Sequence, residues 1–261
     1  MILECKCVID SFKRNAPTQM SHQSHFFHAL IPCAGSGSRM GVGIPKQYFP
    51  LAGSPLVVHT LRAFEAVPQL GIGVTVVAAD DVFMNEAMKQ SLGSRFKVFN
   101  TGGATRAQSV LAGLLALKSM GAGAQDWVMV HDAARCLVTP ELILHLYESC
   151  QHDEVGGLLA LPLADTLKVH VEGRVKATLS RVDKWLAQTP QMFRWELLFN
   201  ALKQAHLVTD ESSAVEQLGL SPKLVTGASF NFKVTYPEDI VLAQAILADR
   251  INKGSYCDEG N

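Results

Sequence analysis

Short apolar runs alternate along the chain with stretches in which apolar residues recur at helical spacing. The runs predict buried strands at Phe27–Pro32, Ile72–Ala78, Phe96–Phe99, Trp127–Val130, Gly157–Leu161 and Lys223–Val225. The amphipathic stretches predict helices at Pro55–Val67, Val82–Ser91, Arg106–Ser119, Pro140–Ser149, Trp195–Ala205, Ser212–Leu218 and Pro237–Ile251. Strands that alternate with helices in this way are typical of an α/β fold with a largely parallel sheet. We therefore predict a single α/β domain over residues 26–255.

One segment departs from this alternation. From Thr166 to Ser180, apolar and polar residues alternate on both sides of the turn Glu172-Gly-Arg. This pattern predicts a β-hairpin. A hairpin outside the main sheet leaves one face to be covered, and a second copy of the chain can cover it. We therefore predict a protruding β-arm over about residues 163–186 that serves dimerisation.

Composition and charge exclude several classes of protein. The net charge of −1 over 261 residues lacks the basic excess of a duplex-binding protein, so no nucleic-acid partner is expected. No apolar run reaches the ~18 residues of a membrane span. The cysteines are scattered without a C-x-x-C pair, which indicates reduced thiols in a cytoplasmic protein. Residues 1–25 are polar and carry neither a signal nor a transit pattern, so we predict a disordered extension.

The loop that follows the first predicted strand carries the strongest chemical signal. It reads Cys33-Ala-Gly-Ser-Gly37, then Arg39, and then Lys46 behind Pro45. Met40 excludes the dinucleotide fingerprint G-x-G-x-x-G, and Pro45 excludes the Walker A loop. Glycines alone also suit an ordinary strand-to-helix turn. Two cations in one glycine-rich loop repel each other unless an anion bridges them, so the loop favours a polyphosphate ligand.

Further candidates follow other predicted strands. Asp132 ends the strand in Val128–Arg135 and could hold a divalent cation beside phosphates; an N-cap or turn aspartate is the less favoured alternative. Ser109, in GGATRAQSV, could bind a base or ribose or could simply face solvent. Lys233 lies within an apolar stretch, predicted as a short strand, and requires a counter-ion there. Arg181, just beyond the hairpin, is a further candidate site residue, although an ordinary surface arginine fits the same position.

These motifs together resemble one enzyme family. PCAGSGSRM, PKQY, GGATRAQSV, HDAAR, QTPQMF, TDESSA and NFKVTYPED stand in the order and approximate spacing of the 2-C-methyl-D-erythritol 4-phosphate cytidylyltransferases, over about Ala29 to Leu247. The resemblance implies a Rossmann-like nucleotidyltransferase fold with a mixed, mostly parallel sheet flanked by helices. It also implies a β-arm exchanged across a homodimer.

The same resemblance implies a reaction. CMP passes from CTP to 2-C-methyl-D-erythritol 4-phosphate with Mg²⁺, pyrophosphate leaves, and the product feeds non-mevalonate isoprenoid biosynthesis. A phosphate monoester is already anionic at neutral pH, so no side chain is required as a general base. Positioning and charge stabilisation are then the work of the site.

Residue roles carry over by position. The resemblance assigns catalytic roles to Arg39, Lys46, Arg181 and Lys233. It assigns CTP contacts to Cys33, Ala34, Gly35, Ser36, Gly37, Gly103 and Ser109. It assigns acceptor-side contacts to Asp132, Ala133, Arg135, Thr166 and Thr189, with Asp132 also beside the metal. Thr166 and Arg181 would come from the arm of the other subunit.

Other functions stay open at this stage. A cytidylyltransferase for a pentitol phosphate such as ribitol 5-phosphate would share the nucleotide loop, but Thr166, Arg181 and Thr189 favour methylerythritol phosphate. A nicotinamide-dependent dehydrogenase is disfavoured by Met40 and by the missing ribose-binding acid. A non-catalytic nucleotide-binding module is disfavoured by the joint presence of Arg39, Lys46, Asp132 and Lys233.

Overall fold

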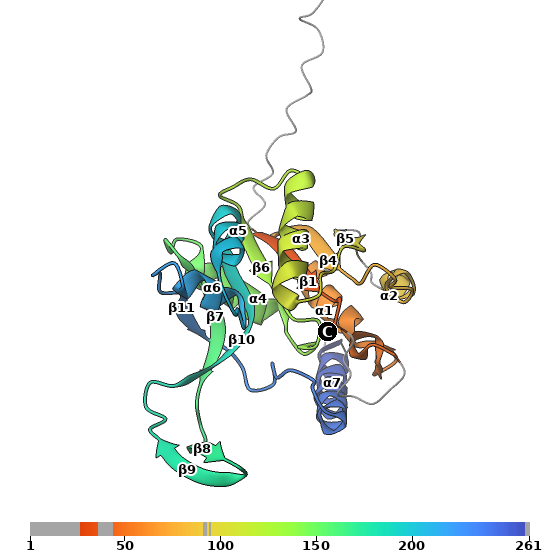
Figure 1. The fold of residues 1–261 in the computed structure, drawn as a ribbon. Helices are drawn as coiled ribbons and strands as arrows, with labels where there is room; N and C mark the ends of the chain where they lie inside the picture. The colour runs from red at the N-terminus through yellow and green to blue at the C-terminus, as the bar shows by residue number, and fades with distance from the viewer. Residues whose placement is uncertain (1–26, 36–43, 91–92, 94, 259–261) are drawn as a thin grey trace, which may run out of the picture.

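A seven-stranded sheet forms the centre of the molecule in this computed structural model, which describes residues 27–35, 44–90, 93 and 95–258 (Figure 1). The strand order is β11-β7-β10-β6-β1-β4-β5. The strands are β1 Phe27–Pro32, β4 Leu70–Val76, β5 Phe96–Phe99, β6 Trp127–Val130, β7 Gly156–Pro162, β10 Trp185–Arg194 and β11 Lys223–Thr226. Within this sheet β10 runs antiparallel to both of its neighbours, and every other pairing is parallel. The prediction of a mixed, mostly parallel sheet is confirmed.

Helices follow the strands much as the hydrophobic spacing predicts. They are α1 Leu56–Glu65, α2 Met84–Gln90, α3 Arg106–Ser119, α4 Pro140–Cys150, α5 Trp195–Gln204, α6 Glu211–Glu216 and α7 Pro237–Asp258. A 3₁₀ turn, η2 Lys46–Tyr48, and the short strands β2 Pro50–Leu51 and β3 Ser54–Pro55 precede α1. Most predicted boundaries differ from these by one or two residues, and α7 extends seven residues beyond the predicted end at Ile251.

Helices cover both faces of the sheet because its central strands alternate their apolar side chains. On β1, Ile31 packs in one core layer together with α1 and α4, whereas Leu30 packs in the other. Met129 and Val130 divide in the same way on β6. The second layer contains α3, α5 and α6. Because both faces of a parallel sheet are buried, polar and charged residues that bind a ligand lie at the ends of its strands.

The strand β10 was not expected from the sequence. The stretch QTPQ in its middle is polar and contains a proline, which argues against a central strand. The structure nevertheless buries Gln188, Thr189 and Gln191, and each of them is hydrogen-bonded to a neighbouring loop or helix. The register also shifts between Ala187 and Gln191, which accommodates the proline. The buried polar groups of β10 are hydrogen-bonded, so the strand is stable without alternating apolar residues. That alternation is the pattern from which a strand is predicted.

The short strand predicted around Lys233 is wrong. Residues 231–235 form an irregular segment that is tied to the site by the bond from the Val234 amide to the Ala134 carbonyl, at 2.8 Å. The segment lies between β11 and α7 rather than in the sheet. The counter-ion expected for Lys233 is nevertheless present, as described below.

The predicted hairpin is confirmed. β8 (Leu167–Val171) and β9 (Arg174–Leu179) pair antiparallel around a turn in which Glu172 and Gly173 have positive φ. Figure 1 shows this hairpin projecting from the body, connected to β7 and β10 by two extended segments. Every residue of the two strands is exposed, including Val171 and Val175. The arm thus presents apolar side chains that the described part of this chain leaves uncovered.

Two glycines with positive φ provide a test of this framework. Gly156 starts β7 at φ +107°, and a Cβ there would lie 2.2 Å from the Met192 carbonyl oxygen of β10. Gly173 has φ +76° in the arm turn with nothing within 4 Å. We expect Gly156→Ala to lower the free energy of unfolding by more than about 3 kcal/mol, because backbone cannot move aside. Gly173→Ala should lower it by only about 1 kcal/mol. Equal losses in urea unfolding would contradict the β7–β10 pairing.

Candidate functional site

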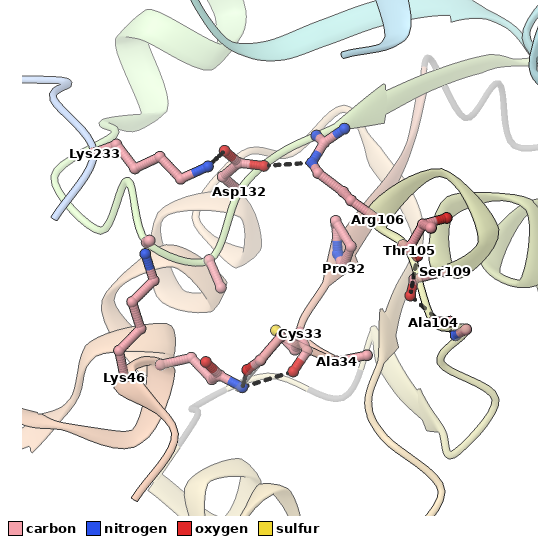
Figure 2. Close-up of a pocket in the computed structure, with 15 residues that line it drawn as sticks. Pro32, Cys33, Ala34, Lys46, Ala104, Thr105, Arg106, Ser109, Asp132 and Lys233 are labelled. Atoms are coloured by element: carbon pink, nitrogen blue, oxygen red, sulfur yellow. Dashed lines mark hydrogen bonds and ion pairs between the residues drawn. The ribbon is translucent and has the colours of Figure 1, made fainter. Parts of the chain in front are cut away.

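A cavity of about 260 Å³ lies at the carboxyl ends of the central parallel strands (Figure 2). It is lined by the loops after β1, β5 and β6, the start of α3, η2 and the segment before α7. The lining residues are Pro32, Cys33, Ala34, Gly35, Lys46, Gln47, Gly103, Ala104, Thr105, Arg106, Ser109, Asp132, Ala133, Ala134 and Lys233. Three of them are cationic and one is acidic, so the described wall suits an anionic ligand.

The loop after β1 is held by the side chain of Gln47. The Gln47 amide nitrogen donates to the Cys33 carbonyl at 2.7 Å and to the Gly35 carbonyl at 3.0 Å. Gln47 is buried and lines the cavity next to Lys46 in the sequence. The two carbonyls are therefore fixed, and with them the path of the described part of this loop along the cavity.

Cys33 itself is not a reactive thiol. It is buried, and burial together with the nearby Asp81 and Asp132 carboxylates raises the pKa of its thiol far above the usual value. The thiolate is the nucleophilic form of cysteine, so this side chain stays neutral at physiological pH. Cys33 therefore contributes its small size and its backbone to the site.

The loop between β5 and α3 approaches the β1 loop closely. A Cβ on Gly102 would lie 2.3 Å from the Cβ of Ala34, so only glycine permits this approach. Thr105 caps α3 in a reciprocal capping box with Gln108. The Ser109 hydroxyl donates to the Thr105 carbonyl and accepts from the Gly103 amide, both at 3.1 Å. Ser109 thus shapes the glycine loop that faces the ligand, in addition to lining the cavity.

Asp132 is the charged centre of the site. Its Oδ2 accepts from the Lys233 Nζ at 2.7 Å, and its Oδ1 accepts from the Arg106 Nε at 2.9 Å (Figure 2). Burial alone would raise the pKa of Asp132, but the charges of Arg106 and Lys233 outweigh it and hold the pKa well below its usual range. Asp132 is therefore ionised at neutral pH, as a ligand for a divalent cation requires.

Arg106 was missed in the sequence reasoning, although it stands within the motif GGATRAQSV. It is the first residue of α3, where a cation opposes the helix dipole. This unfavourable position was the available signal, because a cation there must meet anions elsewhere. It meets Asp132 and the buried carboxylate of Glu211, and these charges raise the pKa of Arg106 despite its burial.

Lys46 and Lys233, both predicted as site residues, line the cavity and lie on the same side of it in Figure 2. Lys46 Nζ donates to the Val234 carbonyl at 3.1 Å, which links η2 to the segment that carries Lys233. Ser36, Gly37 and Arg39, also predicted for the nucleotide loop, lie outside the described residues. Their roles stay predictions.

Thr189 and Arg135 support the site from behind the cavity wall. The Asp132 amide donates to the Thr189 hydroxyl at 3.0 Å, and that hydroxyl donates to His131 Nδ1 at 3.1 Å. His131 Nε2 donates to the Arg135 carbonyl, and burial lowers the pKa of this histidine to about 4, so it is neutral at pH 7. The Arg135 guanidinium donates to the Asn231 and Ala187 carbonyls. Direct acceptor contacts by Thr189 and Arg135 stay predictions.

Thr166 and Arg181 do not reach the cavity of their own chain. Both are exposed on or beside the arm, and neither lines the described cavity. Arg181 donates to the Ala164 carbonyl at the base of the arm. Ala133, by contrast, lines the cavity, and its carbonyl accepts a hydrogen bond from Thr60 of α1. The single chain therefore brings Lys46, Asp132 and Lys233 to one cavity and leaves the arm residues apart.

Comparison with known proteins identifies the family. The pattern of the IspD family, 2-C-methyl-D-erythritol 4-phosphate cytidylyltransferase, matches residues 27–249. A protein of that name from Laribacter hongkongensis is 54% identical over 222 residues, 84% of this chain and 95% of the relative. This chain belongs to the 2-C-methyl-D-erythritol 4-phosphate cytidylyltransferase family. Members of this family are nucleotidyltransferases.

Another relative is longer. A bifunctional IspD/IspF enzyme of Albidiferax ferrireducens is 59% identical over 223 residues, which span 85% of this chain and 53% of the relative. The chain therefore spans about half the length of that bifunctional relative.

Solved structures agree with the assignment. A 4-diphosphocytidyl-2C-methyl-D-erythritol synthase is 38% identical with a TM-score of 0.76, covering 85% of this chain and 98% of that one. The Francisella tularensis 2-C-methyl-D-erythritol 4-phosphate cytidylyltransferase is 33% identical with a TM-score of 0.71, covering 83% and 97%. The expected Rossmann-like nucleotidyltransferase fold is confirmed.

The amide of Gln47 gives a test of the nucleotide loop. We expect Gln47→Leu to raise the Kd for CTP about tenfold, because two loop carbonyls lose their fixed donor at a cost of about 1–3 kcal/mol. Isothermal titration calorimetry measures the change. Gln204→Leu, the same substitution at an exposed position of α5, is the matched control. Unchanged CTP affinity in Gln47→Leu would show that the loop is positioned without this side chain.

Proposed function

We propose that this chain transfers CMP from CTP to 2-C-methyl-D-erythritol 4-phosphate and releases pyrophosphate, a step in non-mevalonate isoprenoid biosynthesis. The single observation that carries the proposal is one cavity at the carboxyl edge of the sheet, in which Arg106 and Lys233 hold an ionised Asp132 and Lys46 adds a further cation. Membership of the family supports the identity of both substrates.

The proposed step is an in-line displacement. A phosphate oxygen of methylerythritol phosphate bonds to the α-phosphorus of CTP, and the bond from that phosphorus to the bridging oxygen of the β-phosphate breaks. The electron pair leaves with pyrophosphate, giving 4-diphosphocytidyl-2-C-methyl-D-erythritol. Lys46 neutralises charge on the triphosphate, and Lys233 orients the acceptor phosphate. These cations act most strongly where charge develops in the transition state.

Mg²⁺ is the proposed cofactor. The described residues contain no cluster of three or more histidine, cysteine or acidic side chains that could hold a metal ion alone. Asp132 nevertheless fits Mg²⁺, which binds to one or two carboxylates and completes its shell with phosphate oxygens and water. When bound, the ion would neutralise charge on the phosphate oxygens. Asp132 would supply the protein oxygen, kept anionic by Lys233 and Arg106.

A homodimer with exchanged arms is the proposed assembly. The arm leaves β7 and re-enters at β10, on the edge of the sheet where the cavity lies. Its apolar side chains are exposed, and its predicted substrate residues Thr166 and Arg181 lie away from the cavity of their own chain. Exchange of the arms would cover the exposed apolar side chains. It would also bring Thr166 and Arg181 to the acceptor pocket of the partner subunit.

The cytoplasm is the proposed location. In the described part of the chain, no helix has both the length and the apolar character that a bilayer span requires. Cys33, Cys136 and Cys150 are free thiols, which fits a reducing compartment. Nucleic acid and membrane are not proposed as partners.

Substrate specificity tests the proposed function directly. Pyrophosphate release should require Mg²⁺, CTP and methylerythritol phosphate together, and the other nucleoside triphosphates and ribitol 5-phosphate should give no turnover.

Lys46→Ala should lower kcat about 100-fold, since a group that stabilises transition-state charge is lost. Lys89→Ala, an exposed lysine of α2, is the control. Turnover with ribitol 5-phosphate but not with methylerythritol phosphate would show that the proposed acceptor is wrong. No turnover with any combination of nucleoside triphosphate and acceptor would overturn the proposal.

Mixed dimers test the arm exchange. We expect Lys46→Ala and Arg181→Ala homodimers each to be strongly impaired. In a heterodimer of the two, one site would combine an intact Lys46 with the intact Arg181 of the other arm. Tandem-tag purified heterodimers should therefore recover about half of wild-type activity, because one of two symmetric sites is whole. Heterodimers as inactive as the parents would place Arg181 in its own subunit's site.

A further inference from the structure

Glu211 is a completely buried carboxylate that the mechanism above does not use. It is the first residue of α6 and has no exposed surface. It does not line the cavity, but it stands directly behind Arg106, which does. An ionisable group is rarely buried without a partner that compensates it. Its partner here is a residue of the site.

The contact between Glu211 and Arg106 fixes the direction of the arginine. Glu211 Oε1 accepts from Arg106 Nη1 at 2.6 Å, and Oε2 accepts from Nη2 at 3.0 Å. A bidentate pair of this kind locks the guanidinium plane as well as its position. The Nε–H group lies outside this pair and donates to Asp132 Oδ1.

The four residues form a line of alternating charge. Glu211, Arg106, Asp132 and Lys233 are linked by contacts of 2.6, 2.9 and 2.7 Å. Without Glu211, the guanidinium could turn and take both oxygens of Asp132 in the bidentate geometry that arginine prefers. Asp132 Oδ2 would then be shared between Arg106 and Lys233. Oδ2, the oxygen proposed to face the acceptor, would then no longer bind Lys233 alone.

α6 has attachments to the body besides Glu211. The neighbouring N-cap residue Asp210 accepts a bond from Gln191 at 2.8 Å, and the Ser212 amide donates to Gln191 at 2.8 Å. Ala214 and Val215 also pack in the core. The helix therefore has its own attachment to β10, and the pairing of Glu211 with Arg106 is a separate feature.

We propose that Glu211 is a positioning residue for CMP transfer, which clamps Arg106 so that Asp132 keeps one oxygen toward Lys233 and the acceptor phosphate. This inference rests on the proposed function. The carbonyls of the β1 loop, the loop proposed to face the triphosphate, accept their described hydrogen bonds from Gln47 and not from Arg106. Glu211 should therefore affect the chemical step and spare CTP binding.

The first experiment compares Glu211→Gln with Glu216→Gln. Glu216 is an exposed residue of the same helix and receives the same substitution. We expect Glu211→Gln to lower kcat about 10–100-fold, as loss of a supporting partner typically does, with the Kd for CTP changed less than about threefold. Glu211→Asp keeps the charge and should recover part of the loss. Circular dichroism and thermal unfolding establish that each variant is folded, and if Glu211→Gln is not, Glu211→Asp decides.

A double-mutant cycle separates positioning from a general effect on the fold. If Glu211 acts through Arg106, then Glu211→Gln should lower kcat less than about twofold further in an Arg106→Gln background. Losses that multiply independently would overturn the proposal, as would normal kcat in Glu211→Gln or a loss confined to CTP affinity. Wild-type protein without cytidylyl transfer would overturn the proposed function and this inference together. Wild-type turnover with an unaffected Glu211→Gln would overturn the inference alone.

Discussion

The site depends on one ionised carboxylate, Asp132, held between two cations at the end of β6. Removing a carboxylate from water is costly, and a lone buried aspartate would take up a proton instead. Arg106 and Lys233 each occupy one of its oxygens and so keep it charged. In return, Asp132 holds two cations near each other that would otherwise repel. The same group therefore keeps the charge that the proposed Mg²⁺ would need and holds together the cationic wall of the cavity.

The sheet order brings these charges together. β1 and β6 are neighbours at the centre of the sheet, so the loop after β1 and Asp132 after β6 lie at the same carboxyl edge. This is the edge at which open α/β sheets bind ligands. α3 begins at that edge with Arg106, and the segment before α7 returns there with Lys233. Four distant parts of the chain thus meet because parallel strands end together.

The antiparallel strand β10 has a second consequence. Because it runs back between β6 and β7, the chain must leave the sheet after β7 and return at the same edge. The arm is the excursion between these two strands. The polar middle of β10, Gln188 to Gln191, is buried and contacts the Asp132 amide through the Thr189 hydroxyl. One irregular strand therefore connects the proposed dimer arm to the chemical centre.

The sequence by itself determined the alternation of strands and helices, the hairpin and the glycine-rich loop with its cations. These features depend on local spacing and on side-chain type, which the chain carries without folding. Only the tertiary structure decided that β10 is a central strand, because its buried polar residues are satisfied by partners far along the chain. The same holds for the pair of Arg106 and Glu211, which are 105 residues apart and begin different helices. The position of Arg106 at a helix start indicates that it needs an anion, but the sequence does not show which one. The pairing of Arg106 with Glu211 arises only when α3 and α6 pack on the same face of the sheet.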